Sequence, residues 1–109
     1  MRIAVASKDG KFVDLHLGKA NSLYIYDWSD KEGVSFVEHR KLDIKESGKH
    51  QGSDVLIACE DCDVIICEQF GFKTKIKAED LGIKLVVEEE TPVMEAVDKY
   101  IQHYKFMNG

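Results

Sequence analysis

Two short apolar segments constrain the fold of this chain more than any other feature. Residues 2–6 read Arg-Ile-Ala-Val-Ala and residues 63–67 read Asp-Val-Ile-Ile-Cys, so each is apolar at nearly every position. Such runs are typical of strands that are covered on both faces of a sheet. We therefore expect an α/β fold in which helices pack against both sides of the sheet.

The rest of the chain predicts three more strands and three helices. Asp30-Lys31-Glu32-Gly33 is typical of a short connection between antiparallel strands. Gly82 is expected to end the second helix, and Thr91-Pro92 to begin the third as a cap residue followed by proline. The expected strands are 2–6, 22–28, 34–41, 63–67 and 83–87, and the expected helices are 53–59, 72–81 and a segment that starts at 91.

Strand 34–41 is expected to alternate between two faces along its length, because successive side chains of a strand point to opposite sides. The predicted faces are Val34, Phe36 and Glu38 on one side and Ser35, Val37 and His39 on the other.

The connections predict where functional side chains meet. Helical crossovers make the first, third, fourth and fifth strands parallel, and the second strand antiparallel to them. Open α/β sheets bind ligands beyond the carboxyl ends of their parallel strands. His16, the loop of residues 42–52 with His50, and Cys67 should converge at this edge. We expect the loop to be mobile, since it is polar and has no periodic pattern.

The most distinctive motif places a carboxylate, an imidazole and a glycine at alternating positions. In an extended chain Asp14 and His16 point to the same side, and Gly18 permits a sharp bend after them. Two interpretations of His16 remain open. It is either a turn histidine bonded to Asp14 or to the backbone, or a ligand of a metal or a metal cluster.

The three cysteines also leave alternatives. Cys67 is either a small core residue or a second ligand at the binding edge. Cys59 and Cys62 have C-x-x-C spacing and should lie at the opposite edge, and the chain has no second such pair for a four-thiolate site. Negative charge on Asp61 and Asp63 is expected to raise the pKa of these two thiols, so we interpret the pair as mainly structural.

Composition excludes several classes of protein. A net charge of −5 argues against a general nucleic-acid binder, and no run of about 18 apolar residues predicts a membrane span. We expect a single domain over residues 1–109, no signal peptide and no membrane partner. An odd number of clustered cysteines favours a reducing cytoplasm over a disulfide framework.

Lysines flank the predicted binding edge. They form either a positive rim for an anionic ligand or an ordinary set of solvated side chains. Gly71 leaves backbone N–H groups free for an anion at the start of a helix. The lysines near this edge are Lys8, Lys11, Lys19, Lys49, Lys73 and Lys75.

We expect no catalytic residues. The sequence contains no serine–histidine–acid arrangement, no phosphate loop and no pair of metalloprotease histidines. The first strand also lacks the carboxylates that a two-metal nuclease needs.

Four segments of the chain, in order, resemble the dinitrogenase iron–molybdenum cofactor biosynthesis family. This family includes NifX-type carriers and the C-terminal domain of NifB-type proteins. The resemblance covers almost the whole chain, and the D-x-H-x-G motif is its most specific part. The segments are 1–10, 13–20, 63–67 and 81–84.

The resemblance implies an RNase H-like, three-layer fold with a five-stranded mixed sheet. It also implies non-enzymatic binding and transfer of an iron–sulfur or iron–molybdenum cofactor or its precursor, between donor and acceptor proteins. Such an anionic cluster brings its own sulfides, so His16 and Cys67 would suffice as ligands, with His50, Lys19 and Lys49 as further contacts. A monomer or weak homodimer is expected.

The chain departs from the family pattern in two places near the site. Leu17 stands where an aromatic residue is usual, and Glu68 follows Cys67 in place of a glycine-rich turn. Glu68 would repel an anionic cluster. A protein–protein interaction or regulatory module of the same fold that binds no metal is therefore the alternative function.

Overall fold

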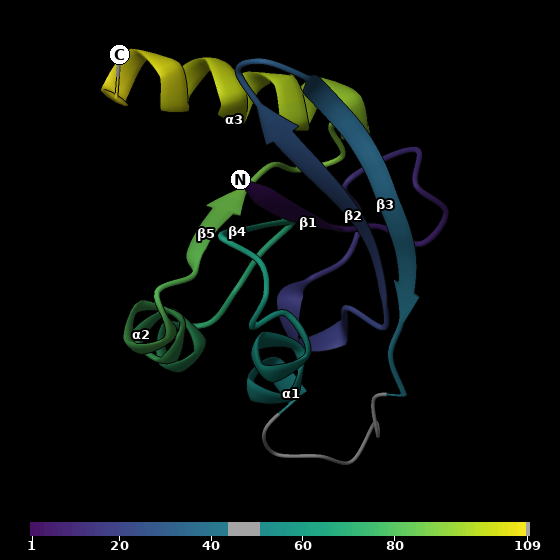
Figure 1. Cartoon of the computed structure of the whole chain (residues 1–109). Coiled ribbons are helices and arrows are strands. Elements are labelled where there is room, and N and C mark those ends of the chain that lie inside the picture. The colour runs from purple at the N-terminus through teal and green to yellow at the C-terminus, as the bar shows by residue number, and fades with distance from the viewer. Residues whose placement is uncertain (44–50, 109) are drawn as a thin grey trace.

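The computed structural model describes residues 1–43 and 51–108, so the predicted site residues Lys49 and His50 lie outside the described residues. The chain folds into one mixed sheet with helices on both faces (Figure 1). The elements are β1 (Arg2–Ala6), a short 3₁₀ helix (Leu17–Lys19), β2 (Ser22–Ser29), β3 (Gly33–Lys41), α1 (Gln51–Ala58), β4 (Val64–Cys67), α2 (Phe72–Leu81), β5 (Lys84–Val87) and α3 (Val93–Asn108).

The sheet has the predicted topology. Its five strands lie in the order β3-β2-β1-β4-β5. Strand β1 pairs with β2 antiparallel and with β4 parallel, and β5 continues the parallel part beside β4. Strand β3 is antiparallel to β2, so it runs in the direction of β1. The carboxyl ends of β1, β3, β4 and β5 therefore lie at one edge of the sheet.

Strand β1 contributes side chains to two separate cores. Ala4 and Ala6 belong to the core on the side of α1 and α2, and Ile3 and Val5 belong to the core under α3. Figure 1 shows α1 and α2 on one side of the sheet and α3 on the other. All four side chains are completely buried, which explains why residues 2–6 are apolar without alternation.

The predicted faces of strand 34–41 are wrong beyond Val37. The pairing of β2 with β3 shifts by one residue at this point, which is a β-bulge. An extra residue in one strand reverses the alternation that follows it. As a result Phe36 and His39 lie on the same face, where Phe36 packs against Tyr26 with ring centroids 5.6 Å apart and His39 stacks on Tyr24 at 4.1 Å.

Two helix starts also differ from the predictions. Helix α1 begins at Gln51, inside the segment expected to be a loop. Thr91 is not the predicted cap, because the first helical hydrogen bond of α3, from the N–H of Ala96, goes to the carbonyl of Pro92 at 2.9 Å and makes Pro92 the N-cap. The N–H of Val93, the first residue of α3, donates instead to the carbonyl of Lys11 at 2.9 Å. The segment that follows β1, distant in the sequence, therefore supplies the hydrogen-bond acceptor for the first backbone N–H of α3.

None of the helices in residues 1–43 and 51–108 is long and apolar enough to cross a membrane.

Helix α2 ends as predicted at Gly82, which has a left-handed backbone with φ of 74°. Gly82→Ala should lower the free energy of unfolding by roughly 1 kcal/mol or somewhat more, because a Cβ is strained in this conformation. Chemical denaturation measures the change. The control, Lys77→Ala at an exposed position of the same helix, should stay within about 0.5 kcal/mol of the parent. An unchanged Gly82→Ala variant would contradict the left-handed cap.

Candidate functional site

Two backbone hydrogen bonds attach the His16 segment to the end of β4. The N–H of Leu17 donates to the carbonyl of Gln69 at 2.8 Å, and the N–H of Glu68 donates to the carbonyl of Leu15 at 2.9 Å. The segment thus runs beside the chain that leaves β4, at the edge where the parallel strands end. The predicted convergence of His16 with the end of β4 is confirmed.

The burial of neighbouring side chains fixes the orientation of His16. Leu15 and Leu17 are buried in the core under α1 and α2, while His16 between them is exposed. His16 itself has an extended backbone, and the 3₁₀ helix begins at the next residue. This turn is closed by the N–H of Lys19, which donates to the carbonyl of His16 at 3.0 Å. Two buried leucines therefore hold an exposed imidazole between them.

Asp14 does not orient the imidazole through the bond that one interpretation required. Its carboxylate accepts the backbone N–H of Lys8 at 2.9 Å and so closes the loop after β1. His16 lies instead beside Glu68, with Nε2 and Oε1 3.6 Å apart. The His16 side chain is 51% exposed, which leaves the ring accessible to a ligand. The carboxylate next to it is the main electrostatic obstacle to an anion.

A shallow hollow of about 340 Å³ opens beside His16. It lies between the 3₁₀ helix and the start of α2, where Gly71 precedes the helix with an extended backbone and gives it no side-chain cap. The first N–H groups of an α-helix have no partner within the helix. Gln69 and Phe70 were not predicted as site residues, although their position directly after the fourth strand would have indicated them. The lining residues are His16, Gly18, Lys19, Gln69, Phe70 and Gly71.

Cys67 reaches the same edge, but its side chain belongs to the core. It is completely buried in the cluster under α1 and α2. Burial raises the pKa of this thiol to about 12, because the charged thiolate loses its hydration. A cluster in the hollow would reach this sulfur only after the core rearranged. Its role as a second ligand stays a prediction, and its burial argues against that role in this conformation.

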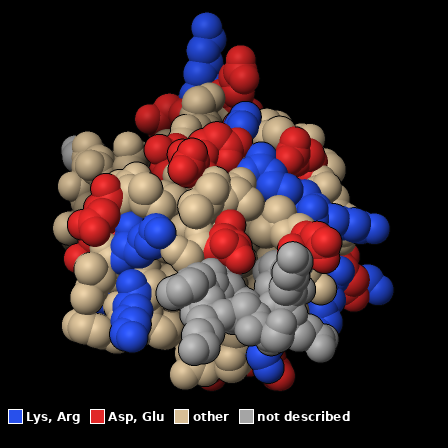
Figure 2. Space-filling model, turned by 90° about the horizontal axis from the view of Figure 1, so that it is seen from below, with Lys and Arg blue, Asp and Glu red and all other residues tan. Residues whose placement is uncertain are grey.

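The charges around the hollow are mixed. Lys19 lines it, and Lys73 and Lys75 are exposed in the first turns of α2. Figure 2 shows the molecule from below, the side of α1 and α2 in Figure 1, with acidic and basic side chains interspersed. The described residues therefore supply individual lysines at the hollow and no continuous basic surface on the side shown.

No preformed metal centre exists in the described ranges 1–43 and 51–108, since nowhere there do three His, Cys, Asp or Glu side chains come together as metal ligands. A bare ion generally needs about four protein ligands. A cluster that carries its own sulfides needs fewer, and an exposed imidazole beside a hollow can provide one. The donor set therefore fits a bound cluster better than a bare ion.

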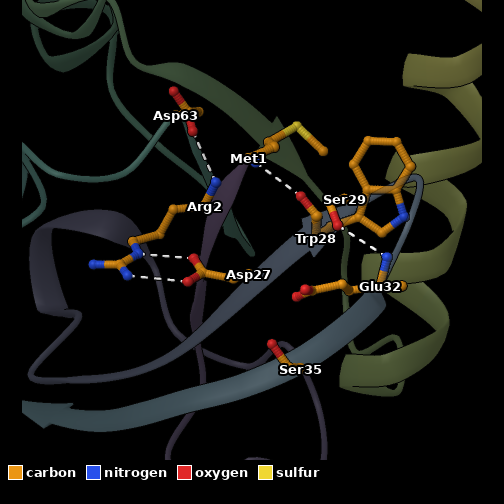
Figure 3. Close-up of a pocket in the computed structure, with 9 residues that line it drawn as sticks. Met1, Arg2, Asp27, Trp28, Ser29, Glu32, Ser35 and Asp63 are labelled. Atoms are coloured by element: carbon orange, nitrogen blue, oxygen red, sulfur yellow. Dashed lines mark hydrogen bonds and ion pairs between the residues drawn. The ribbon is translucent and has the colours of Figure 1, made fainter.

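Cys59 and Cys62 lie at the opposite edge, as predicted, next to the start of β4. A second hollow of about 320 Å³ at this edge contains Arg2, Asp27 and Asp63 (Figure 3). Two of its three carboxylates already have partners, because Asp27 pairs with the Arg2 guanidinium at 2.8 Å and Asp63 accepts the Arg2 backbone N–H at 2.7 Å, while Glu32 is the third. The first hollow, with its exposed imidazole, is the better candidate site.

The fold and this hollow define a three-layer α/β domain with an imidazole-lined site at the carboxyl edge of its sheet. Residues 1–103 match the dinitrogenase iron–molybdenum cofactor family, and the chain therefore belongs to this family.

Two curated relatives agree with this assignment. The chain is 35% identical to Protein NifX of Sinorhizobium fredii over 79 residues, which are 65% of this chain and 49% of NifX. It is 29% identical to the FeMo cofactor biosynthesis protein NifB of the same organism over 91 residues, 77% of this chain and 18% of NifB. The chain thus spans about half of one relative and under a fifth of the other.

The apo form of the orange protein from Desulfovibrio gigas shares the fold, with a TM-score of 0.73. Its sequence is 19% identical, and the match covers 94% of this chain and 88% of the orange protein.

Burial of Cys67 predicts slow alkylation in the native state. With a pKa of about 12, its thiolate fraction at pH 8 is about a thousandfold below that of an ordinary thiol. Iodoacetamide labelling followed by peptide mass spectrometry should therefore modify Cys67 at least that much more slowly in the folded protein than in denaturant. Rapid labelling of folded protein would place this sulfur at the surface and support its role as a ligand.

Proposed function

We propose that this domain is a non-enzymatic carrier that binds an iron–sulfur or iron–molybdenum cofactor, or its precursor, at the hollow beside His16. The observation that carries the proposal is an exposed imidazole held between two buried leucines at the edge where open α/β sheets bind ligands. The chain belongs to a family whose description names the dinitrogenase iron–molybdenum cofactor, and this supports a metal cofactor of that kind as the bound molecule.

His16 has the role of the protein ligand in this proposal. Neutral imidazole binds iron and related metals through a ring nitrogen, and His16 lines the hollow with a side chain that is 51% exposed. Lys19 adds a positive charge, and the first amides of α2, which have no partner within the helix, favour an anion. A single ligand of this kind suits a cargo that must be released again to an acceptor protein.

Glu68 weakens this site. Its carboxylate is 3.6 Å from the imidazole and only 26% exposed, so it repels an anionic cluster and attracts the protonated ring. A cluster bound to Nε2 would occupy the nitrogen that lies beside this carboxylate. Weak, transient binding is the expected consequence. In this proposal the domain works in the cytoplasm, receives the cofactor from a donor protein and passes it to an acceptor protein, and has no nucleic-acid partner.

His16→Ala should weaken binding of isolated iron–molybdenum cofactor, or of its iron–sulfur precursor, at least tenfold. An anaerobic titration followed by visible absorbance and bound iron measures the affinity. His103→Ala, which removes an exposed histidine from α3 on the other side of the sheet, is the matched control and should leave binding unchanged. If neither the parent nor the variants bind cofactor, the interaction module without metal becomes the better account.

Glu68→Gln should tighten cofactor binding about three- to fivefold at low ionic strength. The estimate follows from removing one negative charge within about 5 Å of the bound anion in a largely aqueous setting. The gain should shrink as salt is added, because salt screens exposed charges. Glu95→Gln on α3 removes the same charge across the sheet and should have little effect. Equal gains in both variants would indicate a response to net charge alone.

A further inference from the structure

The turn after α1 brings two cysteines together that the proposed cofactor site does not use. The N–H of Cys62 donates to the carbonyl of Cys59 at 2.9 Å, which closes a tight turn. The α-carbons at the ends of a β-turn are less than about 7 Å apart, and disulfides join α-carbons about 4.4 to 6.8 Å apart. Both side chains are buried, at 0% and 4% exposure. The backbone thus already has a shape that a disulfide can join.

Arginine side chains neutralise Asp61, one of the two acidic residues inside this turn. Arg40 of β3 donates from its two terminal nitrogens to the Asp61 carboxylate at 2.9 and 3.0 Å, and from one of them to the carbonyl of Ala58 at 2.8 Å. Arg2 of β1 adds a hydrogen bond to Asp61 at 2.9 Å. These bonds, above all those from Arg40, hold the pKa of Asp61 well below its usual value. The negative charge of Asp61 is therefore balanced by the arginines and affects the nearby thiols less than an unpaired carboxylate would.

The two thiols differ in acidity, chiefly because of the hydrogen bond between them. Hydrogen bonding from Cys62 lowers the pKa of Cys59, the positive charge of Arg40 lowers it further, and burial and Asp61 oppose both. The pKa of Cys62 is raised, first by its hydrogen bond to Cys59 and then by burial. The expectation that both pKa values would rise is thus wrong for Cys59. One acidic and one less acidic thiol in a C-x-x-C pair are typical of an attacking and a resolving cysteine.

We propose that Cys59 and Cys62 are a redox-active dithiol that small disulfides reversibly oxidise to an intramolecular disulfide. The Cys59 thiolate attacks one sulfur of glutathione disulfide, forms a mixed disulfide and releases one glutathione. Cys62 then loses its proton, attacks the Cys59 sulfur and releases the second glutathione. Two electrons pass from the cysteines to the reagent, and the two thiol protons end on the two glutathione molecules.

A small reagent reaches the buried sulfurs only when this short turn moves. Glu60 and Asp61 in the turn are exposed, and its movement breaks the hydrogen bonds of Asp61 to Arg2 and Arg40. Cys67 lies at the other end of β4, and the Cys59–Cys62 turn precedes that strand. Formation of this disulfide is therefore independent of the proposed cofactor site, and failure of one proposal leaves the other standing.

The test equilibrates the full chain, without air, at pH 7 across a range of glutathione to glutathione disulfide ratios. Samples are quenched in acid, alkylated in denaturant and mapped by mass spectrometry. Cys59 and Cys62 should lose alkylation together in one two-electron transition, while Cys67 stays alkylated. Circular dichroism at each ratio should show that the protein remains folded throughout.

Three variants sharpen the test. Cys62→Ser should accumulate Cys59 as a mixed disulfide with glutathione, and Cys67→Ser, the matched control, should leave the transition unchanged. Arg40→Gln should slow the reaction of Cys59 with glutathione disulfide about threefold or more at pH 7. The gap should close at alkaline pH, because removing the positive charge raises the pKa of the attacking thiol.

The proposal is overturned if folded protein forms no Cys59–Cys62 disulfide at any ratio, if Cys67 is one of the joined residues, or if oxidation occurs only on unfolding. If Arg40→Gln does not fold, the transition of the parent chain still decides the matter.

Discussion

The structure depends most on strand β1, which is paired on both edges and buried on both faces. Its parallel pairing with β4, through partners such as Val5 and Ile66, brings the ends of both strands to one edge. The chain beyond β1 then returns along the chain beyond β4, where Leu17 and Glu68 make their backbone hydrogen bonds. The exposed position of His16 follows from these pairings, because burial of the leucines on either side leaves the imidazole facing solvent.

The two edges of the sheet have different electrostatics. Near the amino edge, Arg2 pairs with Asp27 and Asp61, and the side chain of Arg40, from the carboxyl end of β3, reaches the same Asp61. At the carboxyl edge, within residues 1–43 and 51–108, an ion pair beside the hollow joins His16 to Glu68 when the ring is protonated. Charges at the amino edge are thus held by one another. Those beside the hollow are available to a ligand, which is the property that a carrier site requires.

Local sequence patterns were enough to predict most of the fold. The apolar run 2–6 and the glycine after α2 depend on short-range physics, namely burial on two faces and a left-handed cap. The bulge at Val37 was not predictable in this way, because it arises from the pairing of two strands. The lowered pKa of Cys59 was missed because its largest cause, the hydrogen bond from Cys62, depends on the conformation of the turn. The cation that lowers it further, Arg40, lies on a strand nineteen positions earlier in the chain, and only the folded sheet places it beside the turn.

The measurement that tests the account most directly is residue-resolved NMR of the isotope-labelled chain as paramagnetic cofactor is added anaerobically. Bound cofactor broadens the signals of nearby amides. The account predicts that broadening begins at residues 16–19 and 69–71, around the hollow, and is lost in His16→Ala. Broadening centred on residues 59–63, at the opposite edge of the sheet, would contradict it. That result would assign the cofactor to the cysteine pair.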